Sequence, residues 1–262
     1  MKNSPTRNRA KTATVPLEVA SFSDVGLVRS NNEDYLRTLP EQGVVALADG
    51  MGGHSAGEVA AEVAVEVAVE EVCHALRFTK MDAAQALMVI GQAVERANAS
   101  VFTLAHQKPE LYGMGTTLVI GLFKKGRLFY GHVGDSRLYL FRDGRLTQLT
   151  RDHSLIQEVI DNGIFLSRGE AKEAGVSENV LTRSLGYNME LNVDVNEVAV
   201  RPGDLFLFCS DGLCQPLETA QMERLLGHGN LSLDKRVEAL VDSAMKAGSR
   251  DNVSAILARP LE

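Results

Sequence analysis

The sequence predicts an α+β fold in which antiparallel hairpins and helices form separate blocks. Short apolar stretches separated by tight turns, typical of antiparallel strands, occur near the start, in the middle and near the end of the 262-residue chain. Two long helical patterns lie together between the first and second of these blocks. Strands and helices therefore do not alternate one by one, and this grouping favours α+β over a parallel sheet built from strand–helix units.

The composition is that of a globular protein with a large core. Hydrophobic residues make up 45% of the chain and charged residues 23%, and the net charge is −7, so nucleic-acid binding is not expected. No apolar stretch is long enough to span a bilayer, and the N-terminus lacks the apolar region of a secretory signal. Residues 1–16 are polar and basic and are predicted to be a disordered tail. Three cysteines without a C-x-x-C pair favour a reducing cytoplasm.

The first block contains one ambiguous segment. Residues 17–23 alternate like a strand, and residues 36–39 and 44–48 are predicted to form a hairpin. From residue 55 onward, valines alternate with glutamate and alanine, which suits a strand. The glutamates also recur every four residues, and an S-x-x-E capping box opens the segment, so a helix is predicted. A second amphipathic helix is expected over residues 82–106.

The remaining pattern returns to strands and then ends in helices. Strands are predicted at residues 116–123, 128–133, 137–141, 146–149, 191–200, 204–209 and 253–258, and helices at 218–226 and 233–247. Residues 151–186 differ from their surroundings because they are polar and punctuated by glycine, with one amphipathic segment at 155–162. They are predicted to form an inserted flap rather than a core layer.

Two aspartates follow strands that are apolar on both faces. Asp49 ends such a strand and enters a glycine-rich turn, and Asp211 follows the apolar residues 206–209 in the same way. The glycines allow backbone rather than side chains to line the approach to Asp49. The spacing fits neither the dinucleotide G-x-G-x-x-G pattern nor a P-loop. Asp143-Gly144, between half-polar strands, is expected to be an ordinary hairpin turn.

Four further acids stand at the ends of predicted elements: Glu33, Asp34, Asp135 and Asp251. If several of these six acids lie close together, their negative charges repel each other. The repulsion between two like charges about 4 Å apart is on the order of 4 kcal/mol at an effective dielectric constant near 20. Such a cluster requires counter-charge, and an all-oxygen set without grouped histidine or cysteine favours Mg²⁺ or Mn²⁺ over Zn²⁺. The alternative is that these acids are unrelated turn and capping residues.

Other catalytic arrangements are missing from the sequence. There is no Cys-x5-Arg phosphatase loop, no G-x-S-x-G elbow and no H-E-x-x-H zinc motif. Of the six histidines, only His54, in the glycine turn near Asp49, is a candidate for acid–base work. His132, on a predicted strand, is expected to be a hydrogen-bonded core residue.

Eight short motifs together resemble the metal-dependent serine/threonine protein phosphatases of the 2C type, in their compact bacterial form. The resemblance runs from about residue 22 to residue 258, with the motifs in the order of that family. They are DVGLVRSNNED at 24–34, ADGMGGH at 48–54, GMGTT at 113–117, GHVGDSR at 131–137, DHS at 152–154, VLTRSLG at 180–186, CSDGL at 209–213 and RDNVS at 250–254.

The resemblance implies a four-layer sandwich of two antiparallel β-sheets flanked by helices on both sides. Residues 17–262 would form a single catalytic domain, with the flap beside a site that holds two Mn²⁺ or Mg²⁺ ions and a third, weaker one. By motif position, the resemblance implies that Asp49 bridges both ions and that the Gly50 carbonyl binds one of them. Asp211 and Asp251 would hold the first ion, and Glu33 or Asp34 would serve the second. Asp135 would help to bind the third ion, and Arg29 would bind phosphate.

The implied mechanism is attack on phosphorus by a water that bridges two metal ions and is deprotonated near neutral pH. Two positions depart from the family pattern. Met51 stands where many eukaryotic members have a histidine that is proposed to protonate the leaving group, so His54 or metal-bound water must take that role. Gln215 stands where an acid or asparagine is frequent, which weakens the expectation of a third ion.

The expected function is hydrolysis of phosphoserine and phosphothreonine in proteins, opposing a Ser/Thr kinase that acts on the same substrates. The chain is expected to be a cytoplasmic monomer without nucleic-acid or membrane partners. Two alternatives stay open. One is a metal-dependent phosphohydrolase of small phosphate esters, and the other is a non-catalytic phosphoprotein-binding module.

Overall fold

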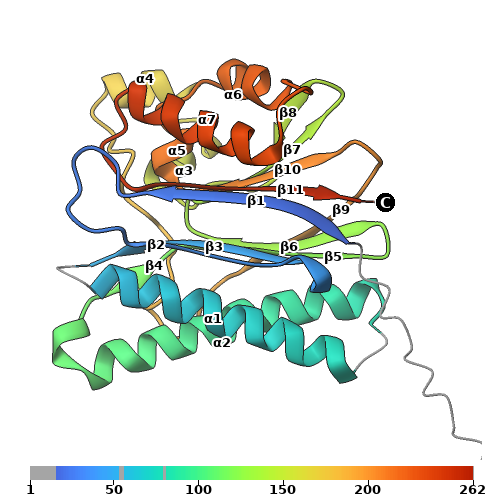
Figure 1. Ribbon diagram of the computed structural model, residues 1–262. Helices are drawn as coiled ribbons and strands as arrows, with labels where there is room; N and C mark the ends of the chain where they lie inside the picture. Colours follow the sequence, from blue (N-terminus) through green and yellow to red (C-terminus); the bar gives the residue numbers. More distant parts are fainter. Residues whose placement is uncertain (1–15, 53–55, 79–80, 262) are drawn as a thin grey trace, which may run out of the picture.

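The computed structural model describes residues 16–52, 56–78 and 81–261, and it has the predicted α+β architecture. Two antiparallel sheets lie face to face, with helices on the outer side of each (Figure 1). The first sheet has the order β1 (Leu17–Asp24), β11 (Val253–Pro260), β10 (Leu205–Cys209), β7 (Arg137–Arg142), β8 (Arg145–Gln148). The second has the order β2 (Asp34–Leu39), β3 (Val44–Met51), β5 (Leu118–Lys124), β6 (Arg127–Val133), β9 (Asp194–Ala199), with β4 (Gly115–Thr116) paired to β3.

The helices form the two outer layers. Helices α1 (Ala56–Phe78) and α2 (Ala83–Gln107) cover the second sheet, and α5 (Asp211–Cys214), α6 (Thr219–Leu226) and α7 (Leu233–Lys246) cover the first (Figure 1). Two further helices, α3 (Leu155–Asp161) and α4 (Arg168–Glu173), belong to the segment predicted as a flap. Single-turn 3₁₀ helices lie at Pro40–Gln42 and Pro109–Leu111. Among the described residues, no helix combines the length and apolar character needed to cross a membrane.

The ambiguous segment after residue 55 is a helix, as predicted. In α1 the buried face carries small residues, including Ala60, Ala61, Ala64 and Ala68, which allow the helix to pack closely on the sheet. The predicted cap, Ser55, lies outside the described residues. Helix α2 begins with a capping box in which the Gln85 amide donates to the Asp82 carboxylate at 2.8 Å and the Asp82 amide donates back to the Gln85 side chain at 2.9 Å.

Two central strands explain why the aspartates follow fully apolar runs. In β3, Val44 and Ala46 face the helical layer, whereas Val45 and Leu47 face the core between the sheets. Strand β10 is buried on both faces in the same way: Leu205, Leu207 and Cys209 pack toward α7, and Phe206 and Phe208 pack between the sheets. Because successive side chains alternate, Asp49 continues the inter-sheet face of β3 and emerges at the end of that core.

Candidate active site

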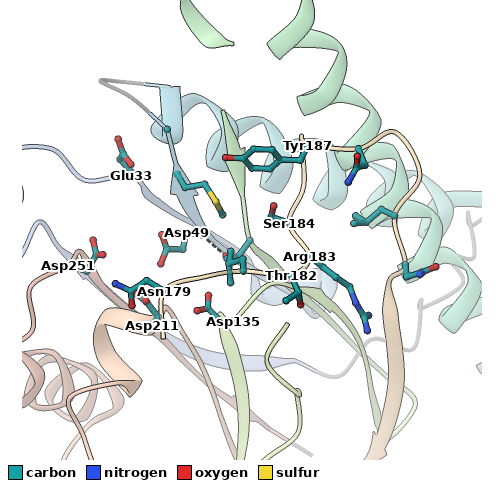
Figure 2. A pocket seen from close by; sticks show the side chains of 18 of the residues that line it. Glu33, Asp49, Asp135, Asn179, Thr182, Arg183, Ser184, Tyr187, Asp211 and Asp251 are labelled. Carbon is teal, nitrogen blue, oxygen red and sulfur yellow. Dashed lines mark hydrogen bonds between the residues drawn. The ribbon is translucent and has the colours of Figure 1, made fainter. Parts of the chain in front are cut away.

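A cavity of about 850 Å³ opens at one end of the sandwich, and acidic side chains line it. Figure 2 shows Asp49, Asp135, Asp211 and Asp251 facing this space from four different elements. The predicted site residues that line the cavity are Arg29, Glu33, Asp49, Gly50, Asp135, Asp211 and Asp251. Asp34 lies behind the wall rather than in it. His54 lies outside the described residues.

Strands β2 and β3 place two carboxylates opposite each other. Asp34 and Asp49 are direct partners in the antiparallel register. The Ser210 hydroxyl donates to Asp34 Oδ2 at 2.8 Å, whereas Asp34 Oδ1 is buried and has no hydrogen-bond partner. Asp34 is thus a buried support for the site, with one oxygen left unsatisfied.

The backbone around Asp49 is held by two threonines. The Asp49 amide donates to Thr117 Oγ1 at 2.9 Å, and the Asp49 carbonyl accepts from Thr116 Oγ1 and from the Thr117 amide, both at 2.9 Å. The next residue, Gly50, has no room for a side chain, because a Cβ there would lie 2.1 Å from the Gly57 carbonyl oxygen. Close packing of backbone on backbone therefore fixes where Asp49 points.

Asp211 begins α5, directly after the end of β10. Gln215 Nε2 donates to Asp211 Oδ2 at 2.8 Å, while Asp211 Oδ1 is buried without a partner. Helix α5 packs tightly on the loop that carries Asp251: a Cβ at Gly212 would lie 2.0 Å from the Asn252 carbonyl oxygen. The close contact brings the two motifs together, and Gln215 takes a role that sequence reasoning did not assign.

Asp251 pairs with the predicted phosphate-binding arginine. Arg29 Nη2 lies 2.7 Å from Asp251 Oδ2, and this hydrogen bond raises the pKa of Arg29. The neighbouring Asn252 fixes the loop that carries Arg29, because its side chain donates to the Val25 and Asn31 carbonyls, both at 2.9 Å. Its side-chain oxygen also accepts from the Glu33 amide at 2.8 Å. In the sequence, Asn252 stands out only as part of the RDNVS motif at 250–254.

Asp135 follows β6 through a turn that requires glycine. Gly134 has a φ of +102°, and a Cβ there would lie 2.5 Å from Thr117 Cγ2. Asp135 itself is buried, with 8% of its surface exposed. The turn thus sets Asp135 beside the threonine that also holds Asp49.

Burial and mutual repulsion raise the pKa values of four carboxyl groups, those of Asp34, Asp49, Asp135 and Asp211. Burial is the largest cause in each case, and neighbouring carboxylates add to it. The pKa is raised to about 7 for Asp34 and Asp135 and to about 6 for Asp211, and that of Asp49 rises well above its ordinary value. Arg29 and Arg183 are the basic side chains among the described residues that line the cavity. The acidic side chains that line the cavity therefore outnumber the basic ones.

The opposite wall comes from the segment predicted as a flap and the residues after it. Asn179, Thr182, Arg183, Ser184 and Tyr187 line the cavity on this side (Figure 2). An isolated bridge between Thr116 and Leu185 ties the segment to the body, and a second bridge, between Ser154 and Leu181, joins two parts of the segment itself. The mobility implied for this segment stays a prediction.

Residues 28–261 match the family described as protein phosphatase 2C. The chain belongs to this protein phosphatase family. The crystal structure of the Mycobacterium tuberculosis serine/threonine phosphatase PstP/Ppp superposes with a TM-score of 0.82 and 34% identity, covering 92% of this chain and 97% of that chain. Staphylococcus aureus serine/threonine phosphatase Stp1 superposes with a TM-score of 0.84 and 28% identity, covering 98% of this chain and 100% of that one.

Relatives in the 2C family differ in total length. Serine/threonine protein phosphatase PstP of Mycobacterium tuberculosis is 36% identical over 248 residues, which are 94% of this chain and 45% of that protein. This chain therefore spans less than half the length of that relative. Protein phosphatase PhpP of Streptococcus pneumoniae is 33% identical over 245 residues, which are 92% of this chain and 96% of that protein.

Proposed function

We propose that this chain hydrolyses phosphoserine and phosphothreonine in proteins, using two Mn²⁺ or Mg²⁺ ions held by the cavity carboxylates. The observation that carries the proposal is the convergence of Asp49, Asp211 and Asp251 on one cavity in a member of the protein phosphatase 2C family. A further support is the crystal structure of the catalytic domain of PstP in complex with two manganese ions, whose sequence is 34% identical to this chain.

The residues of the cavity fit hard divalent cations. Asp34 Oδ1 and Asp211 Oδ1 are buried without hydrogen-bond partners, and burial, together with repulsion from neighbouring carboxylates, raises the pKa of both groups. Cations would supply counter-charge. Every acidic donor offers oxygen, and within the described chain no histidine or cysteine lines the cavity. Such a donor set selects Mg²⁺ or Mn²⁺ over Zn²⁺.

The role of each candidate ligand follows from its position in the motifs of the family. Asp49 would contact both ions, with the Gly50 carbonyl binding one of them. Asp211 and Asp251, which close packing at Gly212 brings together, would hold the first ion. Glu33 would serve the second, with Asp34 behind it, and Asp135 would contribute to a weaker third site. When bound, the ions supply Lewis acidity that lowers the pKa of a water molecule and neutralises phosphate charge.

Arg29 would orient the phosphate. Its side chain is half exposed at the cavity mouth and donates to Asp251 through Nη2. A guanidinium carries five N–H donors in a planar fork, so the remaining donors can bind two phosphate oxygens at once. As negative charge shifts on the phosphate during the reaction, this fixed positive group stabilises the transition state. His54 or metal-bound water is proposed to protonate the leaving group, since Met51 cannot.

The proposed partners are phosphorylated proteins, together with a Ser/Thr kinase that modifies the same substrates. The cavity volume of about 850 Å³ is large enough to admit a phosphorylated side chain. The three cysteines are free thiols, in agreement with the proposed cytoplasmic location.

The test is release of phosphate from a phosphothreonine peptide with and without Mn²⁺. Release that depends on Mn²⁺ and is lost in Asp211→Asn would support the proposal. Undiminished release in excess EDTA, or by Asp211→Asn, would contradict it. Comparing phosphopeptides with small phosphate esters separates a protein phosphatase from a small-molecule phosphohydrolase. Calorimetry without Mn²⁺ binding would favour a non-catalytic binding module.

A further inference from the structure

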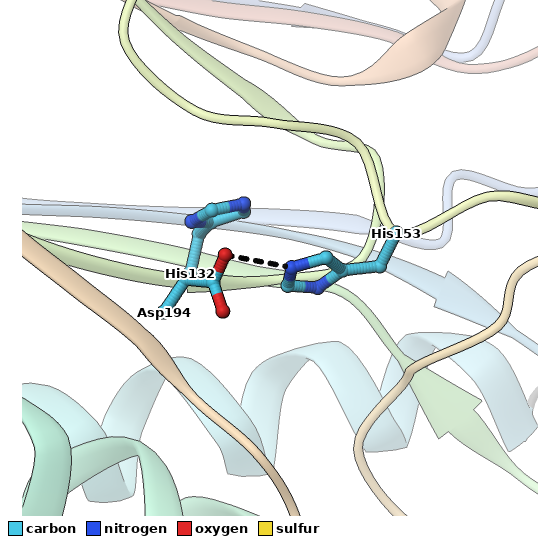
Figure 3. Close-up of side chains that lie close together, drawn as sticks. All are labelled: His132, His153 and Asp194. Atoms are coloured by element: carbon cyan, nitrogen blue, oxygen red, sulfur yellow. Dashed lines mark ion pairs between the residues drawn. The ribbon is translucent and has the colours of Figure 1, made fainter. Parts of the chain in front are cut away.

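A second polar cluster lies beside the carboxylates and is formed by His132, His153 and Asp194 (Figure 3). His132 on β6 is the direct register partner of Asp194 on β9. The His132 and His153 rings are stacked, with centroids 4.6 Å apart and an angle of 18° between their planes. Both histidines are almost fully buried, with 2% and 4% of their surface exposed.

The hydrogen bonds of the two imidazoles argue against a metal site here. His132 Nε2 lies 2.8 Å from the Arg151 carbonyl and must donate to it, which leaves Nδ1 as a free acceptor. His153 has the opposite arrangement, because the Gly134 amide donates to its Nδ1 at 3.1 Å. The proton of neutral His153 therefore sits on Nε2, which has no lone pair for a cation. Nε2 lies 3.2 Å from Asp194 Oδ2 as a close polar contact, without the geometry of a hydrogen bond.

Asp194 is also engaged on its other oxygen. Arg183 Nη1 donates to Asp194 Oδ1 at 2.8 Å, so one carboxylate faces both the His153 imidazole and the Arg183 guanidinium. Arg183 lines the active-site cavity, and Figure 2 shows its side chain extending away from the carboxylate cluster. Burial, the largest cause, lowers the pKa of His153 to about 4, so the imidazole is neutral at physiological pH.

The backbone of His153 makes two more connections. Its amide donates to the Gly134 carbonyl at 3.0 Å, and its carbonyl accepts from the Thr182 amide at 2.9 Å. Gly134 directly precedes Asp135, and Thr182 directly precedes Arg183. His153 thus contacts both the turn that sets Asp135 and the segment that forms the opposite wall of the cavity.

We propose that His153 is a positioning residue that fixes Asp135 and Arg183 relative to each other across the cavity. Through its Nδ1 acceptor it holds Gly134, and with it Asp135. Its Nε2 packs against Asp194, whose other oxygen accepts from the Arg183 guanidinium, and this contact keeps Arg183 on the wall where it would meet the peptide that flanks the phosphorylated residue. The inference rests on the proposed phosphatase function for its kinetic consequences, but not for its structural ones.

Two substitutions separate the two connections. His153→Asn keeps an acceptor near the place of Nδ1 and removes the group that faces Asp194. His153→Gln places an amide near Nε2 and removes the acceptor for Gly134. His74→Ala, at an exposed position of α1, is the matched control.

The two variants are expected to fail differently. His153→Gln should raise the Mn²⁺ concentration for half-maximal activity and lower kcat by on the order of 10- to 100-fold, as for other residues that orient metal ligands. His153→Asn should keep kcat within about twofold and raise KM for a phosphothreonine peptide, but not for a small aryl phosphate. Equal losses in both variants, or none in either, would overturn the proposal.

Amide hydrogen exchange in metal-free protein tests the same connections without activity. Exchange is expected to be faster at residues 134–136 in His153→Gln and at 182–184 in His153→Asn, with both variants folded by circular dichroism. Unchanged exchange would overturn the proposal even if the enzyme is active. Stoichiometric zinc in the purified chain that is lost in both variants would overturn it in favour of a metal site. A wild-type chain without phosphatase activity would reject the proposed function and leave the exchange result decisive for His153.

Discussion

Asp34 and Asp49 lie directly opposite each other on neighbouring antiparallel strands, and burial raises the pKa of both. Like charges in this arrangement destabilise a sheet. Here the pair sits at the end of the inter-sheet core, where Asp211 adds a third carboxylate and raises both pKa values further. The site is therefore held in place by the surrounding fold against its own electrostatic repulsion.

Mn²⁺ is expected to stabilise the folded chain by relieving this repulsion. At a free concentration 100-fold above the dissociation constant, a single bound ion contributes about 2.7 kcal/mol to the free energy of unfolding. Thermal unfolding with Mn²⁺ and with EDTA at pH 7.5 measures the effect. Asp49→Asn should abolish the Mn²⁺-dependent shift in Tm, whereas Asp143→Asn, in the exposed hairpin turn, should retain it. An Mn²⁺ shift in Asp49→Asn equal to that of the wild type would contradict the assignment.

Stability of the metal-free chain is expected to fall as pH rises from about 6.5 to 8. The folded-state pKa values of Asp34 and Asp135 are raised to about 7, far above those of unfolded carboxyl groups, so the folded state binds more protons in this window. The stability that protonation of Asp34 and Asp135 provides is fully present below the pKa of these groups in the unfolded chain. It is lost as the pH rises through their pKa in the folded chain. His153, whose pKa burial lowers to about 4, and His132, whose pKa burial also lowers, act in the opposite direction, mainly below about pH 6.5.

Denaturant unfolding in EDTA across this pH range measures the slope. Asp34→Asn should make it shallower, because one of the titrating carboxyl groups is removed. Saturating Mn²⁺ should also remove the decline, since bound cations favour the ionised carboxylates. A metal-free chain that becomes more stable between pH 6.5 and 8 would show that these pKa values are not raised.

Arg29→Lys is expected to lower kcat/KM for a phosphothreonine peptide by about 10- to 100-fold. Lysine keeps the positive charge but lacks the planar fork, and a hydrogen bond to a charged group contributes roughly 1.5–3 kcal/mol. Steady-state kinetics checks the prediction, with Arg145→Lys on the exposed end of β8 as the matched control. Full activity of Arg29→Lys would mean that charge alone, rather than bidentate geometry, binds the phosphate.

Gly212→Ala is expected to disrupt the site from behind. The added Cβ would lie 2.0 Å from the Asn252 carbonyl oxygen, so α5 and the Asp251 loop must separate. Overpacking of this kind typically costs 1–3 kcal/mol of stability, and here it also displaces Asp211 from Asp251. Calorimetry should show weaker Mn²⁺ binding for Gly212→Ala and unchanged binding for Gly229→Ala, whose Cβ would meet no atom within 4 Å. Equal Mn²⁺ affinity in both variants would contradict the link between this packing and the site.

Much of the fold could be predicted from local pattern. The alternation of buried faces in β3, the Asp82 capping box and the Asp143-Gly144 turn, where both residues have positive φ, each follow from neighbouring residues alone. The helical assignment of α1, which follows from the glutamate spacing and the S-x-x-E sequence, is confirmed. Sheet order could not be predicted in this way, because β1 pairs with β11 from the other end of the chain.

The site was predictable only in part for the same physical reason. Acids at the ends of apolar strands are visible in sequence, and seven of the predicted residues line the cavity. The residues that hold these acids in place could not be predicted from the sequence. Asn252, Thr117 and Gln215 act through hydrogen bonds that only the folded chain creates. The buried position of Asp34 behind Asp49 likewise depends on strand register, which the sequence leaves open.

Anomalous scattering from Mn²⁺ in crystals of this chain is the most direct test of the metal centre. Two peaks are expected in the cavity, the first within ligand distance of Asp49, Asp211 and Asp251 and the second within ligand distance of Asp49. Peaks confined to other surfaces or to the His132, His153 and Asp194 cluster, with none among these carboxylates at saturating Mn²⁺, would contradict it.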